Sequence, residues 1–221
     1  MGDPEAQTDA KWDSPSGHVY GWRWDLGRME AGFYAALVRG RPTFVAWSLL
    51  PAVLRLRGER KTPDELYDIG ALSDNAYRVV QALEASGGVL STGELREKAG
   101  FPAGKEQRAA YLKAVDELDT RLILAKVLSP DVDEMSHALV AERYREQVLA
   151  ADRMSEEEAL QCVLLTYGPG AVYIVPSILA RHLKLAEGPL RAALDRLAQD
   201  GRVALTTIQG QKGACYVWEE V

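Results

Sequence analysis

Cysteine, histidine and long apolar runs are all scarce in this sequence of 221 residues. Its two cysteines, Cys162 and Cys215, and its three histidines do not stand at the spacing of a metal-ligand motif. We therefore expect no disulfide framework, no structural zinc and no other metal. Both cysteines are interpreted as small buried residues.

No apolar stretch approaches the roughly 18 consecutive residues that a membrane-spanning helix needs. Residues 1–18 are polar and lack the apolar core of a secretory signal. We expect a soluble, cytoplasmic protein without membrane contact.

The sequence also lacks three common catalytic or nucleotide-binding motifs. These are a phosphate-cradling glycine-rich loop with Lys-Ser or Lys-Thr, a Gly-x-Ser-x-Gly motif and a His-Glu-x-x-His motif. We expect no cofactor.

What is present is an ordinary globular composition, with 47% hydrophobic and 26% charged residues, which excludes wholesale disorder. The net charge of −6 argues at first against a nucleic-acid partner. However, residues 131–160 alone hold nine acidic and three basic residues, so the rest of the chain is neutral overall. The total charge therefore does not decide whether a polyanion binds.

Apolar periodicity, glycines and prolines divide the chain into five parts. We expect a flexible arm at 1–18, an aromatic-rich helical segment at 19–70, a first three-helix unit at 71–130, an acidic helical connector at 131–154 and a second three-helix unit at 155–221. The predicted fold class is mainly α, of the α+β type.

The aromatic-rich segment is expected to contain two helices. The first is predicted from four apolar residues at helical spacing: Met29, Phe33, Ala36 and Leu37. It would end at Gly40, and a second apolar helix would begin near Thr43, with Pro51 either kinking it or separating two short helices. Residues 39–61 are also locally basic, with six basic residues and one acid.

The first three-helix unit carries clear local start signals. Ser73 can cap one helix, and Ser91 stands three residues before Glu94, which is the capping-box spacing. A third helix is predicted at about 105–120, and the short apolar run 122–128 predicts a strand.

The same order of elements returns in the second unit. Ser155 can cap a helix, Pro176 suits the first position of the next, and a third helix is predicted at about 187–199. Two β-rich runs, 203–208 and 214–218, follow and are joined by a Gly-Gln-Lys-Gly turn. We interpret the two units as a duplication of one fold type.

Three helices followed by a two-stranded wing form the winged-helix arrangement, a helix-turn-helix variant whose third helix can enter the major groove. Residues 181–212 hold six basic and three acidic residues, which suits phosphate contacts. We therefore predict that the second unit binds double-stranded DNA through five residues: Arg181, Lys184, Arg191, Arg196 and Lys212. Arg191 is the first choice for a base-edge contact, and Lys212 at the wing tip could reach a phosphate or the minor groove.

The first unit is a weaker DNA-binding candidate. Four acids balance its third helix: Glu106, Asp116, Glu117 and Asp119. We interpret this unit as structural, or as a dimer or partner surface. Because winged helices also serve as protein-binding modules, a scaffold that binds another protein or a second copy of this chain is the alternative function.

At the level of family, the chain resembles the AlkZ-type DNA glycosylases, which are built from tandem winged helices and excise alkylated or cross-linked bases. The resemblance covers roughly residues 20–221. It rests on the order of units and on three stretches, namely Leu50-Pro51-Ala52, Ala-Leu-Asp-Arg-Leu-Ala-Gln-Asp-Gly-Arg-Val at 193–203, and Tyr216-Val217-Trp218. This resemblance implies a DNA partner and a role in DNA repair or transcription regulation.

The resemblance also implies a catalytic Gln-aliphatic-Gln or Gln-aliphatic-Asp motif, from which this sequence departs. In Gln209-Gly210-Gln211 the middle residue is glycine, and the other glutamines do not fit the pattern. We therefore expect a non-enzymatic DNA-binding protein and assign no catalytic residue. A second alternative is base excision, which would depend on Asp25 or Glu30 for charge and on Tyr20, Trp22 and Trp24 for base stacking.

Overall fold

A β-hairpin lies near the start of the described part of the chain, where the sequence predicts a helix. A computed structural model describes residues 22, 24–128, 134–210 and 213–218. The predicted arm at 1–18 lies outside these residues. After a helical turn at 24–28, strands β1 (Phe33–Val38) and β2 (Arg41–Val45) pair in antiparallel fashion.

The helix prediction for this segment is wrong because its apolar residues also fit a period of two. Phe33, Ala35 and Leu37 all face the core, as alternate residues of a strand do. Arg39 and Gly40 have φ values of +56° and +68°, which close a two-residue hairpin turn and cannot continue a right-handed helix. The segment predicted as helical therefore contributes a hairpin.

A helix follows the hairpin, but it begins later than predicted. Thr43 lies within β2, and a short 3-10 helix, η1 (Trp47–Leu49), precedes α3 (Leu50–Arg57). Pro51 stands in the first turn of α3, where its missing N–H removes no helical hydrogen bond. It therefore starts the helix and does not kink it.

The first three-helix unit follows helix α4 (Pro63–Asp68). Its elements are α5 (Asp74–Ser86), β3 (Leu90–Ser91), α6 (Thr92–Lys98), α7 (Lys105–Thr120), β4 (Leu124–Leu128) and β5 (Met135–Leu139). The predicted helix starts are confirmed, because Ser73 caps α5 and Ser91 forms a capping box with Glu94. The three strands form one antiparallel sheet in the order β3-β5-β4.

The predicted acidic connector at 131–154 is not helical throughout. Strand β5 lies inside it and pairs along β4, so it completes the sheet of the first unit. The helices of this stretch are α8 (Val140–Arg143) and α9 (Arg145–Arg153).

The second unit repeats the order of the first. Its elements are α10 (Glu156–Tyr167), η2 (Gly168–Gly170), α11 (Pro176–Leu183), α12 (Glu187–Gln199), β6 (Val203–Thr206) and β7 (Cys215–Trp218). Ser155 caps α10 and Pro176 opens α11, as predicted. In addition, Ile174 forms an isolated bridge with Tyr216 of β7. This bridge lies just before the middle helix, as β3 does in the first unit.

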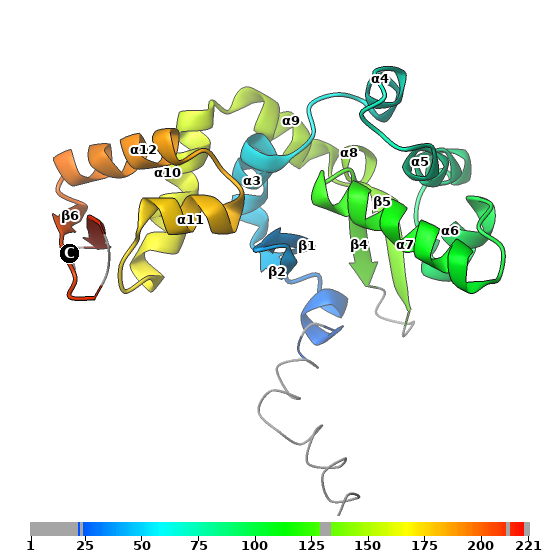
Figure 1. Ribbon diagram of the computed structural model, residues 1–221, viewed down its shortest axis with the longest axis horizontal. Helices are drawn as coiled ribbons and strands as arrows, with labels where there is room; N and C mark the ends of the chain where they lie inside the picture. The colour runs from blue at the N-terminus through cyan, green and yellow to red at the C-terminus, as the bar shows by residue number, and fades with distance from the viewer. Residues whose placement is uncertain (1–21, 23, 129–133, 211–212, 219–221) are drawn as a thin grey trace, which may run out of the picture.

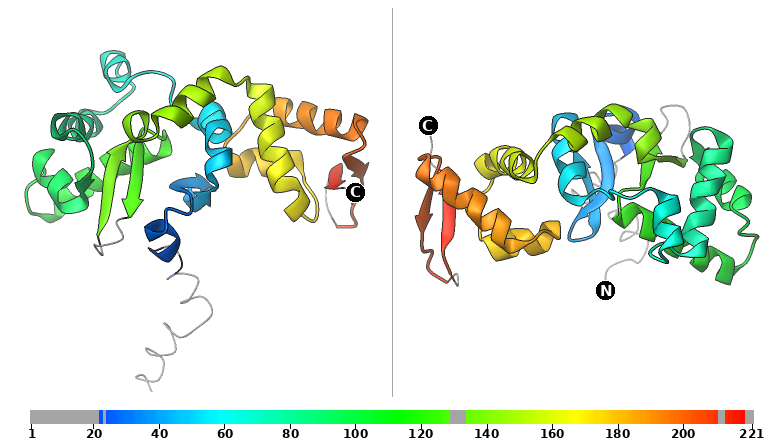
Figure 2. Two further views of the ribbon diagram at one scale, coloured as in Figure 1. Left: turned by 180° about the vertical axis from the view of Figure 1, so that it is seen from behind. Right: turned by 90° about the horizontal axis from the view of Figure 1, so that it is seen from above.

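The two units lie at opposite ends of the molecule, with the hairpin and α3 between them (Figure 1; Figure 2 shows the same order from behind and from above). Each unit has its own apolar core, and a third core joins the hairpin and α3 to β4, α8 and α9. Helix α3 also packs on α10 of the second unit through Ala52 and Ala159. A mainly helical α+β fold is confirmed.

Candidate nucleic-acid interface

Arg181 and Lys184 lie at the end of α11, where the chain turns toward α12. Arg181 is in the last turn of the helix, and Lys184 caps it in the left-handed conformation with φ of +53°. Both residues are exposed. Within the described ranges, neither of them forms a salt bridge. Their charges are therefore available to an anionic partner.

Arg191 and Arg196 are exposed on α12, but each is paired with a carboxylate. Arg191 Nη2 donates to Glu187 Oε1 at 2.6 Å, one turn earlier, and this hydrogen bond raises the pKa of the guanidinium. Arg196 pairs with Glu157 of α10. Exposed pairs of this kind contribute only about 0.2–1 kcal/mol, so a phosphate can compete for either arginine. Base contact by Arg191 stays a prediction.

The same face of α12 is tied to the strand pair by Asp195. The hydroxyl of Tyr216 in β7 donates to Asp195 Oδ1. Desolvation, together with this hydrogen bond to a carboxylate, raises the pKa of Tyr216 to about 12. The Arg191 guanidinium also interacts with the Tyr216 hydroxyl. The hydrogen bond between Tyr216 and Asp195 fixes the orientation of α12 relative to β7.

Two residues predicted to stack on a base, Trp22 and Trp24, do not lie on the elements that carry Arg181, Lys184, Arg191 and Arg196. Lys212 lies outside the described residues. Trp22 is exposed and Trp24 is half-buried, but both lie in the segment before β1 and not on α11 or α12. Base stacking by these two tryptophans stays a prediction.

A hollow of about 280 Å³ lies where this N-terminal segment meets β4 and α8. Its lining includes Glu30, one of the two carboxylates weighed for base excision. Glu30 has a φ of +48°, its carbonyl accepts from Trp47 Nε1 at 2.7 Å, and its carboxylate lies 3.3 Å from Arg143 Nη2. A strained backbone beside a charged and aromatic hollow is a feature typical of functional sites.

Aromatic rings line the same hollow. Tyr34, Trp47 and Tyr144 belong to its lining, and the rings of Trp47 and Tyr144 lie 5.4 Å apart. Behind them, the buried ring of Phe33 meets Tyr144 edge to face. Burial raises the pKa of the Tyr144 hydroxyl. The sequence does not reveal this group, because Trp47 falls in the expected apolar helix that begins near Thr43 and Tyr144 in the expected connector at 131–154. Two residues that lie far apart in the sequence and meet only in the folded chain leave no local sequence pattern.

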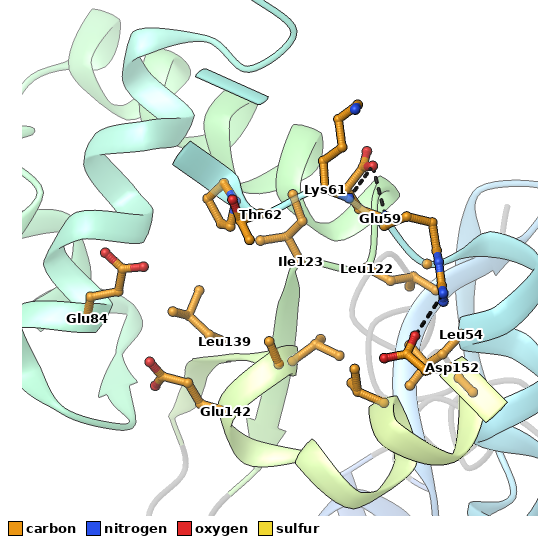
Figure 3. A pocket seen from close by; sticks show the side chains of 17 residues that line it. Leu54, Glu59, Lys61, Thr62, Glu84, Leu122, Ile123, Leu139, Glu142 and Asp152 are labelled. Atoms are coloured by element: carbon orange, nitrogen blue, oxygen red, sulfur yellow. Dashed lines mark hydrogen bonds and ion pairs between the residues drawn. The ribbon is translucent and has the colours of Figure 1, made fainter. Parts of the chain in front are cut away.

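A second hollow, of about 310 Å³, lies between α3, α5 and the α8–α9 segment (Figure 3). Its floor is apolar, with Leu139 and Ile123, whereas Glu84 and Glu142 lie on its rim. Burial, with Asp64 and Glu142 nearby, raises the pKa of the Glu84 carboxyl. The lining holds four acidic residues against two basic ones, Arg60 and Lys61, so its net charge is negative and the hollow is a poor place for DNA.

No part of the described chain groups three or more His, Cys, Asp or Glu side chains so that they could hold a metal ion. Among the helices that the structure describes, none is both long and apolar enough to cross a membrane.

Comparison with known proteins gives the chain a family. The sequence model described as "AlkZ related" matches residues 4–134, which is more than half of the chain. No curated protein matches. Among solved structures, the DNA glycosylase AlkZ of Streptomyces sahachiroi is similar, with a TM-score of 0.55 and 15% sequence identity. The similarity covers 90% of this chain and 54% of that one, so the chain spans about half the length of the structure it matches. The chain belongs to the AlkZ-related family.

Proposed function

We propose that this protein binds double-stranded DNA without excising a base, and that each three-helix unit with its strand pair is a winged helix. The observation that carries the proposal is the pair Arg181 and Lys184 at the turn between α11 and α12. In a helix-turn-helix, this turn and the following helix face the duplex, and cations there contact phosphates.

Other features support the same surface. Arg191 lies in the second turn of α12, near this turn, whereas Arg196 lies in the last turn of the helix. Their exposed carboxylate partners are weak competitors for a polyanion. Membership of the AlkZ-related family favours a DNA partner, since the similar solved structure is a DNA glycosylase. The proposed roles are DNA repair or transcription regulation. The site residues are the five named from the sequence, with Lys212 carried over as a prediction.

Fluorescence anisotropy of the full chain with a labelled DNA duplex tests the proposal. Phosphate contacts release counterions, so the logarithm of the association constant should fall linearly with the logarithm of salt concentration, by about 0.9 per contacted phosphate. Saturable binding with such a slope supports the proposal. If no binding to intact or alkylated duplex is detected even at 50 mM salt, the proposal is wrong.

Base excision is the second candidate, and the hollow beside Glu30 favours it. A carboxylate next to aromatic rings is a chemical arrangement that could hold an extruded base and stabilise charge at the sugar. Incubation with duplexes that carry alkylated bases tests this candidate, with Glu30→Gln as the matched variant. Abasic product that depends on Glu30 would replace the binding proposal, whereas intact oligonucleotide removes the enzyme candidate.

A protein scaffold is the third candidate, and the hollow with the Glu84 and Glu142 rim favours it. An apolar floor with a negative rim fits a cationic segment of a partner protein or of a second copy of the chain. Analytical ultracentrifugation and pull-down test it. Stable self-association or partner capture that is lost in Glu84→Lys, with no retention of DNA, would favour the scaffold.

A further inference from the structure

The turn of the β1–β2 hairpin lies against the end of α11. The backbone N–H of Arg39 donates to the carbonyl oxygen of His182 at 2.8 Å. From α3, the Arg57 guanidinium donates to the carbonyl oxygen of Leu183. Two orphan carbonyls at the end of α11 are thus satisfied from the hairpin and from α3, which holds the two turns together.

Both turns present a basic residue in an unusual backbone conformation. Arg39 has a φ of +56° and Lys184 a φ of +53°. The first position of such a hairpin turn ordinarily holds Asn, Asp or Gly, because a Cβ is disfavoured there. An arginine that persists in this conformation points to a role for its side chain.

Among the residues that the structure describes, no acid forms a salt bridge with the basic residues of the two turns. Arg39 and Arg41 are exposed, like Arg181 and Lys184. Salt bridges between described residues instead engage other cations, namely Arg28, Arg60, Arg121, Lys126, Arg143, Arg191 and Arg196. Of the atoms that the structure describes, none beyond the neighbouring residues lies within 4 Å of the position of a Cβ at Gly40. On the side where a Cβ of Gly40 would lie, no described residue therefore covers the turn.

We propose that the β1–β2 turn is a second contact to the duplex, in which Arg39 and Arg41 bind backbone phosphates next to those held by Arg181 and Lys184. This inference rests on the proposed DNA binding by the α11–α12 turn. Double-stranded DNA carries one charge per about 1.7 Å of its axis, so two touching cationic turns meet several phosphates of one duplex. The hydrogen bond between the turns holds these basic residues at fixed positions relative to one another.

The test uses the full chain with Arg39→Asn and Arg41→Gln together. Asparagine suits the left-handed position, so this variant removes charge without disturbing the turn. The matched control is Lys98→Gln with Lys113→Gln, which removes two exposed cations from α6 and α7 of the first unit. Circular dichroism verifies that both variants fold. A variant with Arg39→Lys and Arg41→Lys keeps the charge.

The measurement is duplex affinity by anisotropy between 50 and 200 mM salt. The slope is that of the logarithm of the association constant against the logarithm of salt concentration. Loss of two phosphate contacts should make this slope less steep by about 1.8. Between 50 and 200 mM salt, the affinity of the variant should therefore fall about tenfold less than that of the wild type. The control and the lysine variant should keep the wild-type slope. If the wild type binds and the Asn/Gln variant keeps its slope, the hairpin contact is wrong while the proposed function stands. If the wild type does not bind, both are wrong.

Discussion

The backbone N–H of Arg39 lies 2.8 Å from the carbonyl oxygen of His182, so one hydrogen bond joins the N-terminal hairpin to the last helical unit. Because of this contact, two turns from distant parts of the chain lie together, and each carries exposed basic residues. Arg39 and Arg41 supply one side of it, and Arg181 and Lys184 the other.

Glu187 limits the affinity of α12 for an anion, since its carboxylate accepts from Arg191 at 2.6 Å. The change Glu187→Gln removes a negative charge and frees the guanidinium. We expect duplex affinity to rise several-fold in anisotropy at low salt, which corresponds to about 1 kcal/mol. The change Arg191→Ala should lower affinity instead. Unchanged affinity in both variants would contradict a role for Arg191 in binding.

Tyr216 stabilises the second unit through its hydrogen bond to Asp195. The change Tyr216→Phe removes the hydroxyl and keeps the ring in the core. We expect the free energy of unfolding to fall by about 1 kcal/mol, since Asp195 stays exposed to water after the loss. Urea unfolding measures this change, and Tyr167→Phe, at an exposed site, is the control that should show no effect. Equal effects of both variants would contradict this role for Tyr216.

His137 in β5 makes the stability of the first unit depend on pH. Its Nε2 lies 3.2 Å from Thr92 Oγ1, and the Thr92 hydroxyl donates its proton to the carbonyl of Met135 at 2.8 Å. The neutral imidazole therefore donates its Nε2–H to Thr92. Burial, with the charge of Lys126 opposite, lowers the pKa of His137 to about 4.

The sign of this pH effect follows from linkage. At neutral pH the imidazole is uncharged in both folded and unfolded chains, so it contributes nothing. Below pH 6.5 only the unfolded chain gains the proton, so stability falls until about pH 4 and then levels off. We expect a loss of about 2–3 kcal/mol from this group between pH 7 and pH 4.5 in urea unfolding. The His137→Gln variant should lose less unfolding free energy than the wild type over the same pH range. A loss identical to that of the wild type would contradict the prediction.

A partly buried ion pair joins α7 to β4. Lys126 Nζ lies 2.6 Å from Asp119 Oδ2, and the side chain of Asp119 is only 3% exposed. Asp119→Ala leaves the half-buried Lys126 ammonium without its partner, so we expect a loss of about 1.5–3 kcal/mol in unfolding free energy. Adding Lys126→Met should recover most of that loss. If the double variant is as unstable as the single one, the pair is not the source of the effect.

The starts of the helices could be predicted because their signals are local. Ser73, Ser91 and Ser155 each stand before an apolar helical pattern and accept a backbone N–H there. The order of elements in the two units follows from these caps and from the glycines that end the helices. Capping residues and glycines are therefore enough to locate the helices from the sequence.

The hairpin and the pairing of charges could not be predicted in the same way. Phe33 and Leu37 fit a helix as well as a strand, and only packing on Leu122 and Ala125 decides between them. Likewise, five DNA-binding residues could be named from the sequence, but the pairing of Arg196 with Glu157 depends on how α12 lies against α10. Contacts between distant segments carry this information.

The central claim is that the α11–α12 turn holds the phosphates of a duplex, and one comparison tests it most directly. Duplex affinity is measured across 50 to 200 mM salt for the wild type, for Arg181→Ala with Lys184→Ala, and for Lys98→Ala with Lys113→Ala. We predict that the dependence of the logarithm of affinity on the logarithm of salt concentration becomes less steep, by about two, only in the Arg181→Ala with Lys184→Ala variant. If both double variants change the slope equally, or neither changes it, the α11–α12 turn is not the DNA contact.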